Sequence, residues 1–266
     1  MAETLKSLRR LISLLDDPDE TTGLNVMAEL LLHADKVLPL LPEYQECSDP
    51  VMRKRIHQLQ AAIILRSRRR FFLARLHDPR IDFFDLLIDV HLQWYDNDSR
   101  PEVEALLAKV FLKTVNHPLN TLEEIRSFML AENLTAEPDS TLKPENYCIA
   151  SILSEHVGAA SILAAISVHL AAGEFFVARV LDDFAVCSPT GEIMLPARNW
   201  QIFHPDEKTP LTPWDLRDIL KLASANLFSA AVNSDSFRYI LTISQALSGI
   251  ASDEILDFLP YPYRRS

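Results

Sequence analysis

The chain has 266 residues, a net charge of −11 and 48% hydrophobic residues, which is enough apolar material for one large domain or two smaller ones. The acidic charge argues against nonspecific binding to nucleic acid or to an anionic membrane, because both carry negative charge. With 5 glycines and 16 prolines, the composition favours helices joined by proline-marked turns over a glycine-rich sheet protein.

The three cysteines, Cys47, Cys148 and Cys187, are widely spaced and form no CxxC pair or Cys/His ligand pattern. We therefore expect no metal site, and the absence of a glycine-rich phosphate loop predicts no nucleotide cofactor. Free thiols suit a reducing compartment, and charges interrupt the first apolar run, unlike in a signal peptide. No apolar stretch is long enough to cross a membrane, so we expect a cytoplasmic protein.

Apolar residues at helical spacing predict a helical N-terminal region over residues 1–80. Three Asp-Pro pairs, beginning at Asp17, Asp49 and Asp78, separate its helical segments. Aspartate as N-cap with proline at the first helical position is a typical helix start. Hairpins repeating at about 30 residues resemble HEAT-type repeats, and with so few copies we expect a helical layer rather than a superhelix.

A basic segment, Arg53–Arg75, interrupts the acidic chain with eight Lys and Arg residues and no acidic residue. One interpretation is a binding module for an acidic partner. The favoured interpretation is a helix whose cations face acidic neighbours inside the same protein.

Helical patterns continue through the middle of the chain. They cover residues 81–95, 101–115, 121–131 and 145–155. Asn120 as cap with Glu123 three residues later predicts a capping box before the third of these helices. The segment between the third and fourth, residues 132–143, is polar and predicts a loop.

The next stretch, residues 158–173, reads GAASILAAISVHLAAG and has small or apolar residues on all sides. This pattern predicts a helix that is buried on every face. We expect Gly158 to allow a tight entry and Gly173 a left-handed exit from the helix.

After residue 173 the pattern changes to short runs of strand-forming residues. We expect strands within residues 175–180, 183–188 and 192–195, then a proline-rich linker and a final helical hairpin over residues 214–233 and 237–247. The predicted fold class is therefore mainly α with a small antiparallel β-sheet, α+β.

A helix followed by three antiparallel strands resembles the core of papain-like and transglutaminase-like proteins. The order of segments is more specific: LLDDPDE helices, the pair Asn146-Tyr147, ILSEHVGAASILAAI, Asp183-Phe184, Leu195-Pro196 and a C-terminal hairpin. This order resembles a bacterial branch of the transglutaminase-like superfamily. The resemblance implies three parts: HEAT-like repeats over 1–80, a transglutaminase-like core over 81–205 and a tetratricopeptide-like hairpin over 206–266.

In that superfamily, a cysteine at the helix N-terminus is the nucleophile, a histidine on a strand is the base, and an Asp or Asn orients the histidine. The corresponding positions here are Ala160, Asp183 and Leu195, so all three depart from the pattern. The resemblance therefore implies a catalytically inactive protein, with no catalytic residue, that binds a protein or peptide partner.

Two alternatives remain open from the sequence. The first is an enzyme with a relocated site that uses Cys148 or Cys187. Cys148 is expected in a first helical turn, but the nearest histidine on its helix, His156, is too distant for a hydrogen bond. The second alternative is the binding module built on Arg53–Arg75. His169 is expected to be a partly buried histidine with one hydrogen-bond partner.

Overall fold

A computed structural model describes residues 2–69, 72–180, 182–205 and 210–234, together with 239, 240 and 243. The chain forms two compact units. One comprises residues 1–71 and 235–266, and the other comprises residues 72–234. Most of the expected helix over 237–247 lies outside the described residues.

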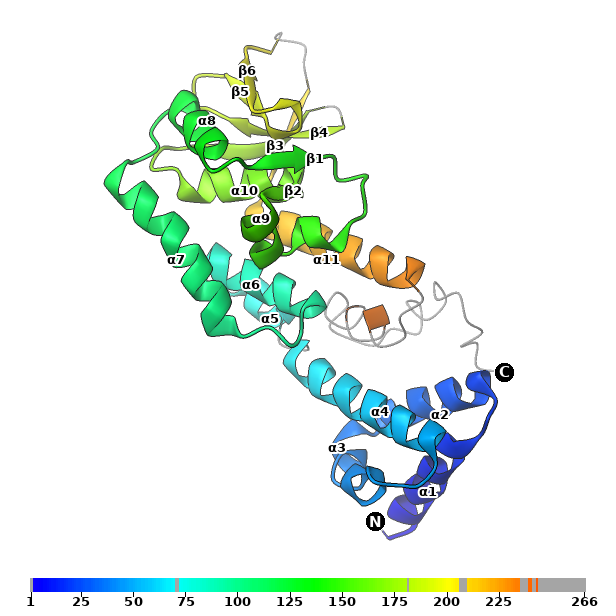
Figure 1. Cartoon of the computed structure of the whole chain (residues 1–266). Coiled ribbons are helices and arrows are strands. Elements are labelled where there is room, and N and C mark those ends of the chain that lie inside the picture. Colours follow the sequence, from blue (N-terminus) through cyan, green and yellow to red (C-terminus); the bar gives the residue numbers. More distant parts are fainter. Residues whose placement is uncertain are drawn as a thin grey trace. The chain divides into compact units, whose positions relative to one another are not determined.

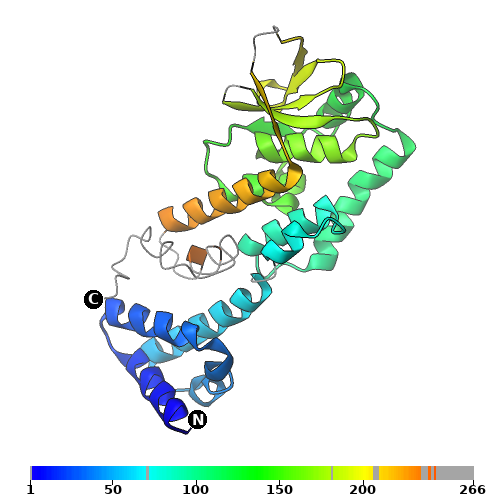
Figure 2. The same ribbon diagram turned by 180° about the vertical axis from the view of Figure 1, so that it is seen from behind.

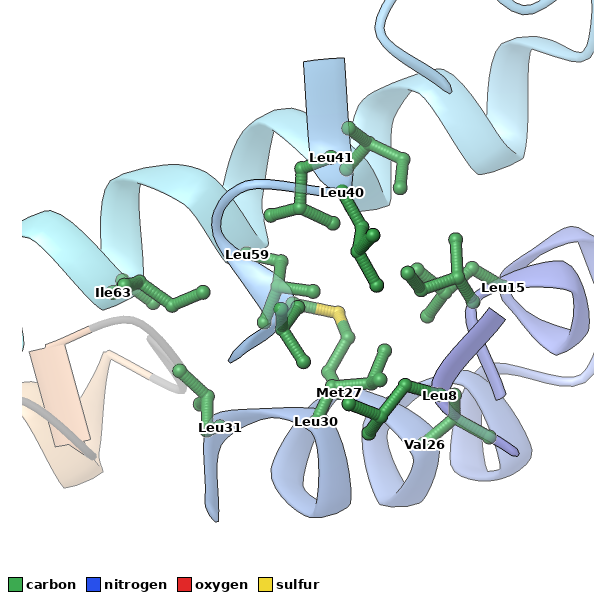
Figure 3. Packing of buried hydrophobic residues seen from close by; sticks show 14 of the residues in the cluster. Leu8, Leu15, Val26, Met27, Leu30, Leu31, Leu40, Leu41, Leu59 and Ile63 are labelled. Carbon is green, nitrogen blue, oxygen red and sulfur yellow. The ribbon is translucent and has the colours of Figure 1, made fainter. Parts of the chain in front are cut away.

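The N-terminal unit is helical where it is described. Its elements are α1 (Ala2–Ser13), η1 (Leu14–Asp16), α2 (Glu20–Leu32), α3 (Ala34–Val37), η2 (Leu41–Tyr44) and α4 (Pro50–Arg69). Leucine, isoleucine and methionine side chains from these helices meet in one apolar cluster, which includes Leu15, Met27, Leu30 and Leu59 (Figure 3). The cluster explains the helical spacing of apolar residues in the sequence, since each helix contributes one apolar stripe.

A buried arginine holds the turn between α1 and α2. The Arg55 guanidinium on α4 donates hydrogen bonds to the carbonyl oxygens of Leu15 at 3.1 Å, Asp17 at 2.5 Å and Asp19 at 3.2 Å. Gly23 on α2 lies against this guanidinium, because a Cβ there would come within 2.2 Å of Arg55 Cζ. The glycine near the start of α2 is thus explained by the space that the arginine needs.

The Asp-Pro pairs differ in their roles. Asp49 caps α4 as expected, accepting a hydrogen bond from the Met52 backbone N–H at 2.7 Å. At the other two pairs the cap is a later aspartate: Asp19 for α2 and Asp82 for α6. In both cases the proline lies in the turn before the helix, which begins two residues after Pro18 and four residues after Pro79.

We expect Arg55→Ala to lower the free energy of unfolding by about 2–3 kcal/mol, because it leaves carbonyl groups in the turn without a charged donor. Urea denaturation of the full chain measures the change. Arg53→Ala is the matched control on the same helix, since Arg53 is exposed, and its effect should stay within about 0.5 kcal/mol. Equal effects of the two substitutions would contradict this role of Arg55.

The second unit contains most of the remaining helices and all described strands. Its helices are α5 (Phe72–His77), α6 (Phe83–Trp94), α7 (Arg100–Asn116), α8 (Leu122–Ala131), η3 (Pro144–Tyr147), α9 (Ile149–Glu155), α10 (Ala160–Leu170), η4 (Pro196–Arg198) and α11 (Leu216–Asn233). The capping box of α8 uses Thr121 and Glu124, one residue after the predicted pair, Asn120 and Glu123.

Two sheets accompany these helices (Figure 1). The strands β1 (Thr135–Glu137) and β2 (Val157–Ala159) form a short parallel pair. The larger sheet is antiparallel with the order β6-β5-β4-β3-β7. Its strands are β3 (Phe176–Val180), β4 (Asp183–Cys187), β5 (Ile193–Leu195), β6 (Gln201–Phe203) and β7 (Leu211–Trp214). The expected α+β class is confirmed.

The sheet is larger than the three-stranded meander expected from the sequence. The proline-rich segment expected as a linker supplies β7, including Pro213, and a further strand, β6, lies just before it. Because β7 pairs only with β3 at the edge of the sheet, a proline there interrupts no central ladder. The unit boundary also differs from the expected one: residues 206–234 belong to the same unit as the core, and this unit begins at residue 72.

The two faces of the larger sheet are distinct. On one face, Ala178, Ala185, Cys187, Ile193 and Leu195 form an apolar cluster without any described helical residue. The central helix α10 packs against β3 and β4 and covers the other face (Figures 1 and 2). The sheet therefore separates α10 from this apolar cluster.

The central helix is buried but shorter than predicted. It runs over residues 160–170, and Gly158 lies in the strand before it. Gly173 is not in the left-handed region, since Gly191, with a φ of 88°, is the one described glycine with positive φ. A Cβ at residue 173 would come within 2.7 Å of the Phe175 ring, so a larger residue there would require this ring to move.

Candidate functional site: the N-terminus of α10

The first turn of α10 is the place where the superfamily resemblance implies a reactive group. It follows β2 directly, and its N-cap residue is Ala159, which has no side chain that can accept a hydrogen bond. Ala160 and Ser161 in this turn are both buried. Water therefore cannot satisfy the free N–H groups of the helix start, and a protein acceptor is required.

Asp139 supplies that acceptor from the loop between β1 and η3. Its Oδ2 accepts a hydrogen bond from the Ser161 backbone N–H at 3.0 Å. Its Oδ1 accepts a second hydrogen bond from Ser161 Oγ. One carboxylate thus caps the helix from a position 22 residues earlier in the sequence.

A second set of hydrogen bonds holds the Asp139 loop in place. The Tyr147 hydroxyl in η3 donates to the Asp139 carbonyl oxygen at 2.9 Å. The Asn226 side-chain amide on α11 donates to the Tyr147 hydroxyl, also at 2.9 Å. Tyr147 is itself buried, and burial raises the pKa of its hydroxyl well above the usual value, so it remains protonated and able to donate.

The electrostatics of this site balance burial against the positive end of the helix. Burial raises the pKa of Asp139, whereas the hydrogen bonds from Ser161 and the charge of Arg179 lower it. The net shift is upward, so burial is the largest contribution. The helix N-terminus favours a negative charge at this point, which is the same effect that lowers the pKa of a catalytic cysteine.

The structure places the three positions implied by the resemblance on different sides of the sheet. Ala160 contributes a buried methyl group to the first turn of α10. Asp183 and Leu195 belong to the sheet face that α10 does not cover, since Asp183 shares it with Ala185. Asp183 lies 3.7 Å from the Arg198 guanidinium, and Leu195 is buried in the apolar cluster.

Cys148, the first thiol of the relocated-site alternative, lies near a histidine–aspartate pair. Burial raises its pKa well above the ordinary value, and the charges of Glu145 and Asp98 raise it further. Asp98 Oδ2 lies 3.0 Å from His91 Nε2, and the Nδ1 of His91 has no hydrogen-bond partner. The thiol therefore forms no hydrogen bond with this imidazole, and no base is in place to activate it.

Cys187, the second candidate, is part of the buried apolar cluster on the sheet face opposite α10. Burial raises its pKa to about 11. A thiol with that pKa is almost wholly protonated at neutral pH and is a poor nucleophile.

Two arginines of the basic segment Arg53–Arg75 form hydrogen bonds within the protein. Arg55 binds carbonyl groups of its own unit, and Arg75 Nε donates to Asp89 Oδ2 at 2.6 Å. The side chains of Arg68, Arg69 and Arg70 lie outside the described residues. His169, as expected, is half-buried and has one acidic partner, Asp82, whose Oδ2 lies 3.1 Å from its Nε2.

The sequence pattern does not single out Asp139, which is one of several polar residues in the loop over 132–143. Asn146-Tyr147 contributed to the resemblance, but their hydrogen bonds to this loop and to α11 follow from tertiary structure. No group of three or more His, Cys, Asp or Glu side chains that could hold a metal ion occurs among the described residues. Within the same residues, no helix is both long and apolar enough to span a membrane.

No protein-family model, curated protein or solved structure matches the chain.

We expect Asp139→Ala to lower the free energy of unfolding by about 1–3 kcal/mol, because it leaves the buried Ser161 N–H and hydroxyl without an acceptor. Asp139→Asn is the matched variant, since its amide oxygen can still accept from the Ser161 N–H and its NH2 group can donate to the Ser161 hydroxyl oxygen. It should lose much less stability. Urea denaturation at pH 7 compares the two, and equal losses would contradict the capping role.

The pH dependence of the same variants tests the carboxyl group itself. Because burial raises the pKa of Asp139, the folded protein keeps this proton at a pH where the unfolded chain has released it. The stabilisation that this bound proton provides therefore decreases as the pH rises above the pKa of an aspartate in the unfolded chain, which is about 4. The free energy of unfolding of Asp139→Asn, relative to wild type, should increase over that interval. A difference that does not change with pH would contradict the raised pKa.

Thiol titration tests the state of the cysteines. In the native protein, Ellman's reagent should react rapidly with the half-exposed Cys47 and slowly with the buried Cys148 and Cys187, whose pKa values burial raises. All three should react rapidly in denaturant. Cys47→Ser should remove the rapid native phase. A rapid phase that persists in this variant would reveal an accessible, activated thiol and contradict this assignment.

Proposed function

We propose that this chain is a catalytically inactive member of the transglutaminase-like superfamily that acts as a scaffold for a protein or peptide partner. The observation that carries the proposal is the α10 N-terminus, where Ala160 provides only a methyl group and Asp139 occupies the helix start. An enzyme of this superfamily would place a thiolate there.

A carboxylate can take the place of a catalytic thiolate at this helix start. A thiolate and a carboxylate are both anions, and both are stabilised by the free N–H groups at a helix N-terminus. Asp139 therefore meets the electrostatic requirement of the buried helix without providing a reactive group. Asp139 also binds the side chain and backbone of Ser161, which is fully buried.

The remaining thiols support the same proposal. Cys148 and Cys187 are both buried, and their pKa values are raised rather than lowered. Three free cysteines also support our placing the protein in a reducing compartment such as the cytoplasm. We propose a protein or peptide as the partner, because helical layers recognise such ligands through grooves and faces between helices.

An activity assay tests this proposal. Purified protein should show no thiol-sensitive amide hydrolysis, and no acyl transfer from a glutamine peptide to an amine. Thiol-sensitive turnover that Cys148→Ala or Cys187→Ala abolishes would overturn the proposal and support the relocated site.

Restoring the thiol alone should not create activity. Ala160→Cys is expected to remain inactive in the same assays, because Asp139 still occupies the helix start and Asp183 and Leu195 supply no base. The double variant Ala160→Cys/Asp139→Ala distinguishes these reasons. If the double variant also remains inactive, the missing base is sufficient to explain the loss. Turnover by the single variant would contradict the proposal.

A further inference from the structure

Each end of α6 is held by a contact between a histidine and an aspartate. At the C-terminal end, Nε2 of His91 lies 3.0 Å from Oδ2 of Asp98, in the turn before α7. At the N-terminal end, Nε2 of His169, in the last turn of α10, lies 3.1 Å from Oδ2 of Asp82. Asp82 also caps α6, because its Oδ1 accepts a hydrogen bond from the Phe84 backbone N–H at 2.8 Å. Two separate contacts therefore connect α6 to the segments around it.

The His91 imidazole is in a site that favours its neutral form. The side chain is fully buried, and its ring lies against the Tyr95 ring with 5.2 Å between the ring centroids. Since a carboxylate can only accept a hydrogen bond, the proton of the neutral ring lies on Nε2 and is donated to Asp98. Nδ1 is buried without a hydrogen-bond partner, so a second proton there would be a buried donor without an acceptor. Burial accordingly lowers the pKa of His91, although Asp98 opposes this shift.

His169 is in a comparable environment. Its ring lies against the rings of Phe83 and Phe84, with 5.1 and 4.8 Å between the ring centroids. Burial lowers the pKa of His169, whereas the charge of Asp82 and the hydrogen bond to it oppose this shift. The side chains of Asp82 and Asp98 are 54% and 45% exposed, so each imidazole lies only one side chain below the surface.

Many other charged groups on the elements packed against α6 and α10 have partners of their own. Glu102 and Lys109 on α7 are exposed. The charge that acts on His91 is therefore that of Asp98, and the charge that acts on His169 is that of Asp82. The groups with partners elsewhere are Arg75 with Asp89, Arg100 with Asp85, Asp89 and Glu104, Lys113 with Glu132, Glu145 with Cys148, Glu155 with Tyr95, Arg217 with backbone carbonyl groups, Lys221 with Asp218, Glu137 with Lys143, Arg179 with Asp182 and Arg198 with Asp183.

We propose that these two contacts form an acid-sensitive switch at α6, in which neutral His91 and neutral His169 hold the two ends of the helix and protonation releases them. This inference goes beyond the proposed scaffold function and does not depend on the state of the α10 N-terminus. Because α6 packs against α5, α7, α9 and α11, release of either end affects several helices of the second unit (Figure 1).

The pH interval of the switch follows from the histidines in the open state. A histidine exposed to water takes up a proton near pH 6.5. In the closed state, burial keeps both imidazoles neutral at a lower pH. The closed state therefore has its full stability above about pH 6.5. Below that pH the open state binds a proton that the closed state lacks, so the stability of the closed state decreases as the pH falls, until its own histidines are protonated.

Hydrogen–deuterium exchange of the full chain, corrected for the pH dependence of the chemical exchange rate, tests the switch. The Tyr95 amide, bonded to the His91 carbonyl oxygen, reports on the C-terminal end of α6. The Leu86 amide, bonded to the Asp82 carbonyl oxygen, reports on the N-terminal end. Between pH 7.5 and pH 5.5, protection at each end should fall about three- to tenfold, as expected when opening of that end binds one proton.

Single substitutions separate the two ends. His91→Gln retains an N–H donor for Asp98 but cannot be protonated, so it should remove the pH dependence at the C-terminal end and leave it at the N-terminal end. His169→Gln should have the reverse effect. His57→Gln is the matched control, because His57 is exposed on α4 in the other unit. It should leave both ends pH-dependent, and far-UV circular dichroism verifies that each variant is folded.

Asp98→Asn keeps the test available if His91→Gln does not fold. This variant retains the buried imidazole, so the loss of protection at the C-terminal end of α6 should persist at acidic pH. Its disappearance in Asp98→Asn would assign the effect to the carboxylate and overturn the proposal. Wild-type protection that does not change over this pH interval would overturn it as well, and so would a loss that both glutamine variants retain.

Discussion

The burial of the first turn of α10 is the constraint on which the arrangement of the second unit depends. A helix start that is closed to water must find acceptors for its N–H groups inside the protein. Ala159 and Ala160 have no side-chain acceptor, so the Asp139 carboxylate accepts the hydrogen bond from the Ser161 N–H. The loop that carries Asp139 must then be fixed, and Tyr147 and Asn226 accomplish this from two further elements. One capping requirement thus links α10, the loop, η3 and α11.

The same constraint connects the fold to the proposed loss of catalysis. A helix N-terminus attracts a negative charge whether the anion is reactive or inert. Once Asp139 supplies that charge, the helix retains its capping and its packing without a cysteine. The cost is the burial of a carboxyl group, which raises the pKa of Asp139 despite its hydrogen bonds. Capping and packing requirements therefore explain the hydrogen bonds at this site.

The N-terminal unit solves a similar problem with the opposite charge. There the groups that require partners are carbonyl oxygens in the turn after α1, and Arg55 supplies the donors from α4. Gly23 provides the space for this guanidinium. In both units, one charged side chain from a distant part of the sequence satisfies backbone groups that local residues leave without partners. Such long-range pairs explain why loops with little regular structure have a fixed conformation.

The sequence by itself determined the helical periodicity, the buried character of residues 160–170, three strands of the larger sheet and the α+β class. These features depend on local propensity and on the spacing of apolar residues, which are properties of neighbours in the chain. Only the tertiary structure decided that β6 and the proline-rich segment's β7 join the sheet, and that Asp139 caps α10. The physical reason is that strand pairing at a sheet edge and capping across 22 residues depend on which segments meet in space.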